Sequence, residues 1–308
     1  MGLEQSPTVV SLCRTFEKHS KLIESVGLLV WDNSPVPLDN PVLPVSVSHF
    51  HYRHGCGENL GVSGAYNRAL EIAESMDCRW LLLLDQDTTL TEDYLPRLLE
   101  CCRLLEDSPE IAAIAPLLME GEKIISPMTL RSNRWKHARP FSRPFTGVCR
   151  NKVFAANSGT LMRVSSLKKV GGYDENFWLD VSDVVVFDRL YQAGKRLYVD
   201  GDLRIQHRLT NNDYDGSMSP QRYRNFIAAE GAYWDMYGTV FQGALQTARL
   251  SARVIVQYLR YRDKVYSRIT GEYLFQRLLS AKGTRLQQWK QQSLKRDLPA
   301  VVGGVVVG

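Results

Sequence analysis

Two aspartates follow a run of four leucines in the segment LLLLDQDTTL, residues 81–90. Charged side chains are almost never buried without a partner, so the acids mark either the protein surface or the binding place of a positive group. Carboxylates one residue apart, such as Asp85 and Asp87, can share a hard divalent cation together with the oxygens of a diphosphate. A solvated turn is the alternative, because Asp and Thr are frequent in turns.

The elements around these acids alternate between strand and helix. Apolar runs predict strands at residues 26–35, 79–87 and 111–118. Helical spacing of apolar residues predicts helices at 63–75 and 92–107. Such alternation is typical of a mostly parallel α/β sheet, in which ligands bind at the carboxyl ends of the strands. Asp32 and the pair Asp85 and Asp87 all fall at such strand ends.

Composition excludes several classes of protein. With 44% hydrophobic and 23% charged residues, the chain has the balance of a soluble globular protein rather than a disordered one. The sequence contains no apolar run of membrane-spanning length, and its first residues lack the basic and apolar regions of a signal peptide. We therefore expect a cytoplasmic location. The six cysteines form no C-x-x-C pair, which predicts reduced thiols rather than disulfides or a zinc site.

Six segments carry a resemblance to a known family. They are VWDNSP (30–35), NLGVSGAYNRAL (59–70), LLLLDQD (81–87), NSGTLMR (157–163), GGYDENFWLDVSDVVVFDRLYQAG (171–194) and IQH (205–207). In this order they resemble the family-two inverting nucleotide-sugar glycosyltransferases, and among these the bacterial rhamnosyltransferases. The resemblance covers residues 26 to 207. It implies a GT-A type α/β fold, with a single mostly parallel Rossmann-like sheet flanked by helices and a helical C-terminal extension.

The resemblance also implies a nucleotide-sugar site with a divalent metal, Mg²⁺ or Mn²⁺. Asp87 would be the principal metal ligand, Asp85 would lie toward the ribose and the metal, and His207 would complete the metal shell. A lone histidine is more often structural. The remaining residues implied to contact the donor are Asp32 at the base or ribose, Asn59, Gly61 and Asn67 beside the nucleotide, and Arg222 or Arg224 at the diphosphate, although an arginine at either position can also be a surface residue.

The acidic block after residue 171 would hold the catalytic base. Inverting transfer needs one carboxylate that accepts the proton of the acceptor hydroxyl. Asp183 aligns with the acidic residue of the family at the start of a helix, and Asp180 is the second candidate. Ser182 is expected to cap that helix. The alternative is that Asp183 only stabilises the helix start, as aspartates often do.

The N-terminus departs from the family pattern. Relatives begin with an apolar strand and a polar loop, whereas Pro7 and the short TVVSL segment leave little room for a strand here. We expect the first strand to be missing or short. The sheet would then have an exposed hydrophobic edge, with weakened nucleotide affinity.

The C-terminal part is basic and helical in pattern. Residues 245–298 hold twelve Lys or Arg against three Asp or Glu, a balance of +9 that leaves −4 for residues 1–244 of a chain with net charge +5. We predict a catalytic domain over 1–230, a basic amphipathic helical extension over 231–298, and a flexible tail over 299–308. The extension could pack on the catalytic domain, form a homodimer, or lie on an anionic membrane surface. No motif for nucleic acid accompanies the charge.

The expected activity is transfer of a sugar, rhamnose from dTDP-rhamnose as the best assignment, to a glycan or lipid-linked saccharide acceptor in cell-surface polysaccharide synthesis. The protein would work in the cytoplasm or at the cytoplasmic face of the inner membrane. Two alternatives stand beside it: a catalytically silent nucleotide-sugar binding or assembly protein, and a Rossmann-type oxidoreductase. The second lacks a G-x-G-x-x-G motif after a first strand.

Overall fold

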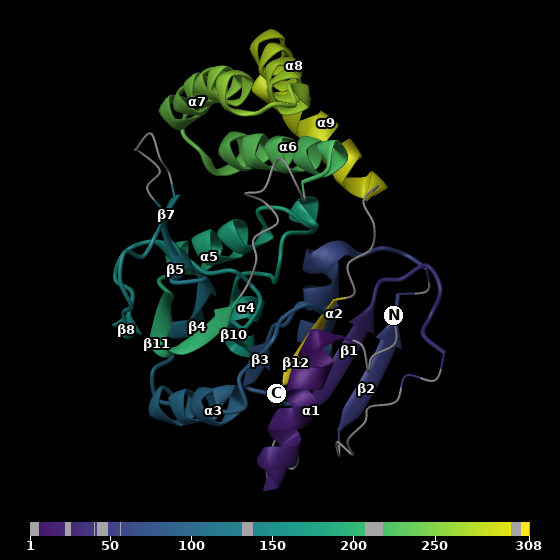
Figure 1. Ribbon diagram of the computed structural model, residues 1–308, viewed down its shortest axis with the longest axis vertical. Coiled ribbons are helices and arrows are strands. Elements are labelled where there is room, and N and C mark those ends of the chain that lie inside the picture. Colours follow the sequence, from purple (N-terminus) through teal and green to yellow (C-terminus); the bar gives the residue numbers. More distant parts are fainter. Residues whose placement is uncertain are drawn as a thin grey trace.

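The computed structural model describes residues 6–21, 26–39, 41, 49–55, 57–130, 138–206, 218–296 and 303–307. An α/β part carries the strands, and four C-terminal helices lie together on one side of it (Figure 1). The expected α/β architecture with a helical C-terminal region is confirmed, although the strands of the described residues form three sheets rather than one.

The largest sheet has six strands in the order β3-β10-β4-β11-β8, with β5 beside β4. The strands β4 and β11 are parallel, and β10 runs antiparallel to both of its neighbours, β3 and β4. These strands are β3 (Trp80–Leu82), β4 (Ile111–Glu120), β5 (Lys123–Ser126), β8 (Gly147–Val148), β10 (Leu161–Arg163) and β11 (Arg196–Gln206).

Two further sheets have three strands each. The first has the order β12-β1-β2, in which β1 and β2 are parallel. The second has the order β7-β6-β9 and is antiparallel. Their bounds are β1 (Leu28–Asp32), β2 (Phe50–His54), β12 (Gly303–Val307), β6 (Met128–Leu130), β7 (Ala138–Pro140) and β9 (Val153–Phe154).

Helices connect these strands and cover them with apolar side chains. The α2 helix packs Tyr66, Ala69 and Leu70 into one core cluster, and the α1 helix packs Leu12 and Phe16 into another. The helices of this part are α1 (Pro7–Lys18), α2 (Gly61–Ser75), α3 (Tyr94–Leu104), α4 (Val164–Lys169), the 3₁₀ helix η3 (Glu175–Phe177) and α5 (Ser182–Gln192).

The predicted strands and helices are found, with shifted ends. The largest shift concerns the run at 79–87, of which only β3 (Trp80–Leu82) is strand. Leu83 and Leu84 are fully buried although they lie beyond the strand. The chain turns directly after them, which places Asp85 at the end of the buried run.

The N-terminal segment is a helix, and no strand precedes β1 among the described residues. Ser6 caps α1 by accepting a hydrogen bond from the Val9 N–H, and Pro7 occupies the first turn, where its missing N–H costs nothing. The position of a first strand beside β1 is taken by β12, which pairs antiparallel with β1 from Leu28↔Val307 to Trp31↔Gly303. In Figure 1, β12 lies between β1 and β3.

This pairing corrects the expected exposed edge. The edge of β1 is hydrogen-bonded to a strand from the other end of the chain, so its backbone groups are satisfied. Residues 303–307 fall in the segment for which the sequence predicts a flexible tail. Sequence patterns could not reveal the pairing, because a short apolar segment does not specify a partner almost 300 residues away.

Removal of residues 299–308 should destabilise the protein. Because β1 would lose the ladder to β12, we expect the melting temperature to fall by at least about 3 °C, the shift that about 1 kcal/mol produces in a domain of this size. Hydrogen exchange at the amide of Leu29 should become faster, whereas exchange at Leu28, whose N–H donates to the His49 carbonyl at 2.8 Å, should change less. Unchanged melting and exchange would contradict the pairing.

The C-terminal helices are α6 (Pro220–Tyr237), α7 (Val240–Arg260), α8 (Val265–Leu279) and α9 (Lys282–Lys295). The domain boundary predicted after residue 230 falls inside α6. Phe177 and Val185 of the α/β part pack against Tyr233 of α6 and Trp289 of α9. Two of the four helices therefore pack directly on the α/β part.

Several basic residues of these helices form internal ion pairs. Buried Asp235 of α6 binds Arg277 of α8 at 2.9 Å and Arg285 of α9 at 2.8 Å. Arg253 of α7 binds Glu230 of α6 at 2.7 Å. Some of the basic residues that the sequence analysis assigned to a charged surface therefore hold the helices together instead. Within the described ranges, no helix is both long enough and apolar enough to cross a membrane.

Candidate active site

The acidic turn after β3 is held by hydrogen bonds from three directions. The Tyr66 hydroxyl of α2 donates to Asp85 Oδ1 at 2.9 Å. The Asp85 N–H donates to Ser158 Oγ at 3.0 Å. Asp87, two residues on, is exposed. The apolar run therefore ends in one acid fixed by a buried tyrosine and one open to solvent.

The start of α1 holds the backbone of the same turn. Ser6 Oγ donates to the Gln86 carbonyl at 2.8 Å, and Thr8 Oγ1 donates to the Asp85 carbonyl. The Thr88 N–H donates back to Thr8 Oγ1 at 3.0 Å. Sequence reasoning missed these positioning residues. Their local signal was Ser6 followed by Pro7, a typical helix start.

The acidic block forms a strained helix start. Val181 has φ +67°, a left-handed conformation that is unusual for a β-branched residue. It occupies the N-cap of α5 without a side-chain hydrogen bond, so the predicted cap at Ser182 is wrong. Such strain costs roughly 1–3 kcal/mol and clusters at functional sites. It lies between Asp180 and Asp183, the two candidates for the base.

Asp180 is tied to α6 through both of its carboxylate oxygens. Arg222 donates to Oδ1 at 2.8 Å, and Asn225 donates to Oδ2 at 2.6 Å. Burial raises the pKa of Asp180, while the attraction of Arg222 and the hydrogen bond from Asn225 oppose that rise. A carboxylate with both oxygens occupied by donors is poorly placed to accept a proton.

Asp183 has a different environment. The residue is half-buried, and no described Lys or Arg forms an ion pair with it. Burial raises the pKa of Asp183 to about 6, with a hydrogen bond from the Val184 N–H opposing the rise and the charges of Asp180 and Asp85 adding to it. Asp85 and Asp183 thus lie close enough to interact, although they are 98 positions apart in the sequence. A carboxylate with a pKa near neutrality suits proton transfer.

Tyr66 and Tyr173 complete the enclosure, and sequence reasoning did not single them out. Their rings pack at a centroid distance of 5.3 Å. Burial raises the pKa of both hydroxyls well above the usual value, and the nearby charges of Asp85 and Asp183 raise it further. The Tyr173 hydroxyl donates to Asn157 Oδ1 at 2.9 Å, and Asn157 Nδ2 donates to Ser182 Oγ at 3.3 Å. These bonds link the segment NSGTLMR to the start of α5.

Asp32 is fully buried at the end of β1. It accepts hydrogen bonds from the Ser34 N–H at 2.8 Å and from the Tyr52 hydroxyl at 2.5 Å. Burial alone would raise the pKa of Asp32, but these hydrogen bonds outweigh it and the net pKa is lowered. The structure gives the carboxylate a role in the turn, and contact with a nucleotide stays a prediction.

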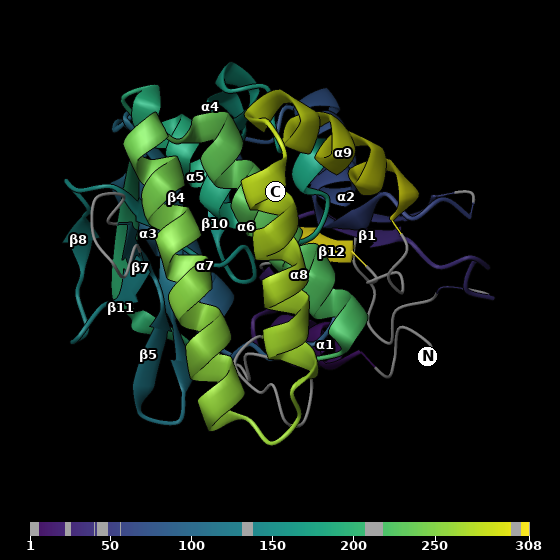
Figure 2. The ribbon, with the colours of Figure 1, turned by 90° about the horizontal axis from the view of Figure 1, so that it is seen from above.

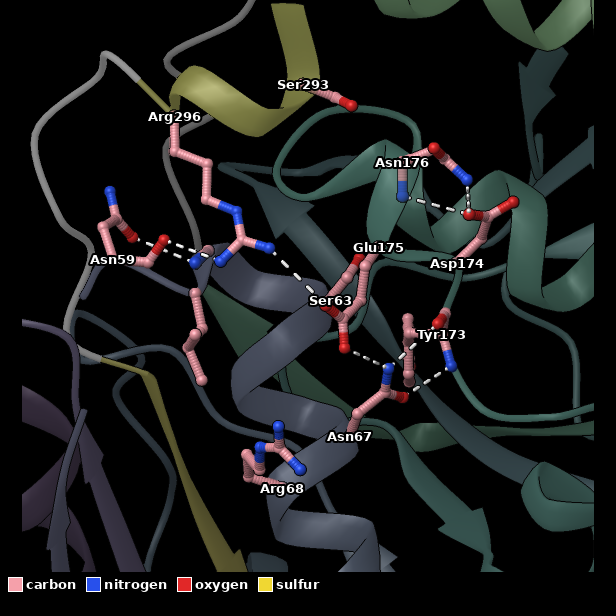
Figure 3. A network of polar contacts seen from close by, with 12 residues as sticks. Asn59, Ser63, Asn67, Arg68, Tyr173, Asp174, Glu175, Asn176, Ser293 and Arg296 are labelled. Carbon is pink, nitrogen blue, oxygen red and sulfur yellow. Dashed lines mark hydrogen bonds and ion pairs between the residues drawn. The ribbon is translucent and has the colours of Figure 1, made fainter. Parts of the chain in front are cut away.

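Asn59 and Asn67 belong to one polar network (Figure 3), and Gly61 joins it through its backbone. Asn59 Oδ1 accepts from the Gly61 N–H at 2.9 Å. Gly61 has φ +66°, and a Cβ there would clash with the carbonyl oxygen of Trp178. The close approach that requires glycine at this position is therefore to the backbone of Trp178.

Asn67 and Arg296 connect α2 and α9 to the loop before η3. Asn67 exchanges two hydrogen bonds with the backbone of Tyr173, at 2.8 and 3.0 Å. Arg296, just after α9, donates to the Asn59 carbonyl at 3.0 Å and lies 3.5 Å from Glu175 (Figure 3). The network therefore holds the end of the helical extension against the start of α2.

The two arginines proposed for the diphosphate are separated by the structure. Arg222 lies at the site through its ion pair with Asp180. Arg224 points to another side of α6, where it lies 3.2 Å from exposed Glu272 of α8. Only Arg222 is brought to the acidic enclosure.

A divalent metal fits the chemistry of Asp85 and Asp87, since both offer carboxylate oxygens at one turn. The third predicted ligand, His207, lies outside the described residues. Within the part of the chain that the structure describes, no three His, Cys, Asp or Glu side chains are grouped to hold an ion. None of the five cysteines in the described ranges forms a disulfide.

The family comparison falls on this same region. Residues 32–171 match the model of the glycosyl transferase family 2. The match includes the turn of Asp85 and Asp87 and ends where the loop leading to α5 begins. The match covers less than half of the chain and lies within the α/β part described above.

Other comparisons are distant. Among curated proteins, none matches the chain. Similar solved structures include GalNAc-T7 with UDP, GalNAc and Mn²⁺, with 14% identity, a TM-score of 0.44, and coverage of 82% of this chain and 47% of that one. Another is TarS 1–349 of S. aureus, with 10% identity, a TM-score of 0.45, and coverage of 96% and 89%. The chain thus spans about half the length of the GalNAc-T7 chain.

Proposed function

We propose that this protein is an inverting glycosyltransferase that takes a sugar from a nucleoside-diphosphate donor. The observation that carries the proposal is the proximity of Asp183, a half-buried carboxyl with a pKa of about 6, to the acidic turn at Asp85. This proximity supports Asp183 as the proton acceptor next to the turn at which we propose that a metal and a diphosphate bind. The family match over residues 32–171 supports the same activity.

Each of these residues then has a separate role in a single displacement reaction. Asp183 accepts the proton of the acceptor hydroxyl as its oxygen attacks the anomeric carbon, while the bond to the diphosphate breaks on the opposite face. Asp180 holds Arg222 through their ion pair and acts as a positioning residue. When bound at Asp85 and Asp87, a divalent cation would stabilise the charge of the leaving diphosphate.

The donor and acceptor are assigned by resemblance. The D-Q-D form of the acidic turn favours rhamnose, supplied as dTDP-rhamnose, and a glycan or lipid-linked saccharide as acceptor in polysaccharide synthesis. A screen of nucleoside-diphosphate sugars for hydrolysis with Mn²⁺ tests this. Turnover of dTDP-rhamnose above that of UDP-sugars is the expected result, and hydrolysis of none would refute the activity.

A second candidate is a silent nucleotide-sugar binding protein. It is favoured by one observation: the strand beside β1 is β12, antiparallel and from the C-terminus. Calorimetry separates the two functions. Binding of dTDP with Mn²⁺ but no hydrolysis or transfer of any donor would favour the silent protein.

We further propose that α7 and α8 contact an anionic membrane surface. The two helices lie side by side (Figure 2), on the side of the molecule away from the sheets (Figure 1). They expose large apolar side chains, including Ile255, Leu259 and Phe275. Over residues 240–279 the exposed charged residues are four basic, Arg260, Arg262, Lys264 and Arg268, and two acidic, Asp263 and Glu272. An apolar face with a basic margin is typical of helices that lie in the interface of anionic lipids.

Replacing Ile255 and Leu259 together by serine should weaken binding to phosphatidylglycerol vesicles by at least about tenfold, because both side chains would otherwise enter the lipid. Co-sedimentation measures this. The matched control is Leu104→Ser on α3, which removes an equally exposed leucine, 74% accessible, from the α/β part. Equal binding by all variants, or a wild-type dimer that the double variant disrupts, would overturn the membrane proposal.

A further inference from the structure

A cavity of about 280 Å³ lies beside Asp183. It is enclosed by the start of α5, by one side of α6, and by strands of two sheets. Its walls come from six segments of the chain between Leu118 and Trp234. The lining residues that carry the argument are Met128, Phe154, Ala156, Val184, Phe226 and Trp234.

The walls of this cavity are apolar almost throughout. Of the sixteen lining residues, only Ser126, Asp180, Asp183 and Glu230 are neither aliphatic nor aromatic. Ser126 Oγ already accepts a hydrogen bond from the Ala156 N–H at 2.8 Å. Glu230 is bound by Arg253 through two hydrogen bonds, at 2.7 and 3.0 Å.

The two aspartates differ in whether a cation binds them. Asp180 is neutralised by Arg222 at 2.8 Å. Asp183 has no such cation among the described residues. The cavity therefore combines an apolar interior with one carboxylate that is able to take a proton at its wall.

We propose that this cavity receives an apolar group of the acceptor, an alkyl or aryl substituent carried next to the hydroxyl that Asp183 deprotonates. The proposal rests on the proposed transferase function. The hydroxyl groups of a further sugar would find few hydrogen-bond partners in this cavity. Because burying a polar group without a hydrogen bond costs free energy, the cavity disfavours a sugar. A dry cavity of about 150 Å³ is large enough for benzene, so this one holds a group of roughly ten carbon atoms.

An apolar group in this position would also serve the reaction. It would fix the neighbouring hydroxyl against Asp183, and positioning of this kind is a large part of catalysis. It would exclude water from the wall that carries the base, and water is the competing nucleophile for the donor. The acceptor class follows: an amphiphilic saccharide or a glycosylated lipid rather than a free oligosaccharide.

Calorimetry with three probes tests the proposal on the intact chain, in the presence of dTDP and Mn²⁺. The probes are methyl, phenyl and octyl β-D-glucopyranoside, the last below its micelle concentration. We expect octyl or phenyl glucoside to bind at least about tenfold more tightly than methyl glucoside, since several carbon atoms become buried. Preference for octyl indicates a lipid-like acceptor, and preference for phenyl an aryl one. Equal affinity, or no binding of any of the three, would overturn the proposal.

A variant that fills the cavity tests whether the preference for apolar glucosides arises there. Ala156→Phe should abolish the preference for the apolar glucoside and leave donor hydrolysis within about twofold, because Ala156 lines the cavity and is not among the residues proposed to bind the donor. Ala281→Phe, at an exposed position before α9, is the matched control and should keep the preference. Val184→Thr makes the cavity wall more polar with little change of volume. This variant should reduce the preference for the apolar glucoside even if Ala156→Phe does not fold.

The two proposals fail in different ways. Donor hydrolysis with no preference among the glucosides would refute the apolar cavity alone. A clear preference for the apolar glucosides without hydrolysis or transfer of any donor would instead refute the transferase. Retention of the preference in Ala156→Phe and in Val184→Thr would place the apolar group elsewhere.

Discussion

Asp183→Asn is expected to lower acceptor turnover by a factor on the order of 10² to 10⁴, the usual scale of general-base catalysis. Asparagine keeps the size of the side chain and can still accept the hydrogen bond that the Val184 N–H donates at 2.8 Å. Donor affinity should therefore be unchanged in calorimetry. If Asp183 only stabilised the start of α5, asparagine would serve nearly as well and activity would barely change.

The pH dependence of the wild-type protein follows from the same group. Because the base must be ionised and its pKa is about 6, transfer should rise with pH through about 6. The folded protein binds more protons at Asp183 than the unfolded chain between pH 3.8 and about 6, so stability falls as pH rises through this window. Above it, the buried charge costs up to about 3 kcal/mol.

Asp183→Asn should consequently be more stable than the wild type at pH 7.5 and nearly equal to it below pH 4. Urea unfolding at both pH values measures this difference. Higher stability together with lost turnover is the expected combination for a catalytic residue that is costly to the fold. A variant that is both inactive and less stable at pH 7.5 would contradict this account of Asp183.

Asp180→Asn is the matched control. It keeps the shape of the side chain but weakens the charge-assisted bond to Arg222. We expect lower stability, and a loss of turnover that is smaller than for Asp183→Asn. A larger loss for Asp180→Asn than for Asp183→Asn would assign the base to Asp180.

Asp87→Ala should remove most of the activity, on the order of 10²-fold, if Asp87 holds the cation at the leaving diphosphate. The melting temperature should stay within about 1 °C, because the side chain is exposed at the end of a turn. Metal-dependent binding of dTDP should be lost in parallel. Full activity in this variant, or full wild-type activity in excess chelator, would refute the metal-dependent mechanism.

Two further variants control for charge and for structure. Glu100→Ala removes an exposed acid of α3 and should leave activity unchanged. Asp85→Ala removes the acceptor of the Tyr66 hydroxyl, which is fully buried, and should lower stability as well as activity. A loss of stability therefore separates Asp85 from Asp87.

The sequence by itself determined the local elements and the end of the sheet where the acids lie. Apolar runs and helical spacing located β1, α2, β3, α3 and β4, because these patterns depend on neighbouring residues. The same reasoning placed Asp85 directly after a buried run and anticipated that a first strand is lacking. It also identified Asp183 at the start of a helix.

Only the tertiary structure decided which of these residues act together. The strand beside β1 comes from residues 303–307, and Val181 rather than Ser182 occupies the cap of α5. Arg222 reaches the acidic enclosure whereas Arg224 faces α8. The physical reason is that burial, ion pairing and pKa depend on atoms contributed by distant segments. The pKa of Asp183 is raised by enclosure and by Asp180 and Asp85, and the spacing of residues along the chain does not encode that enclosure.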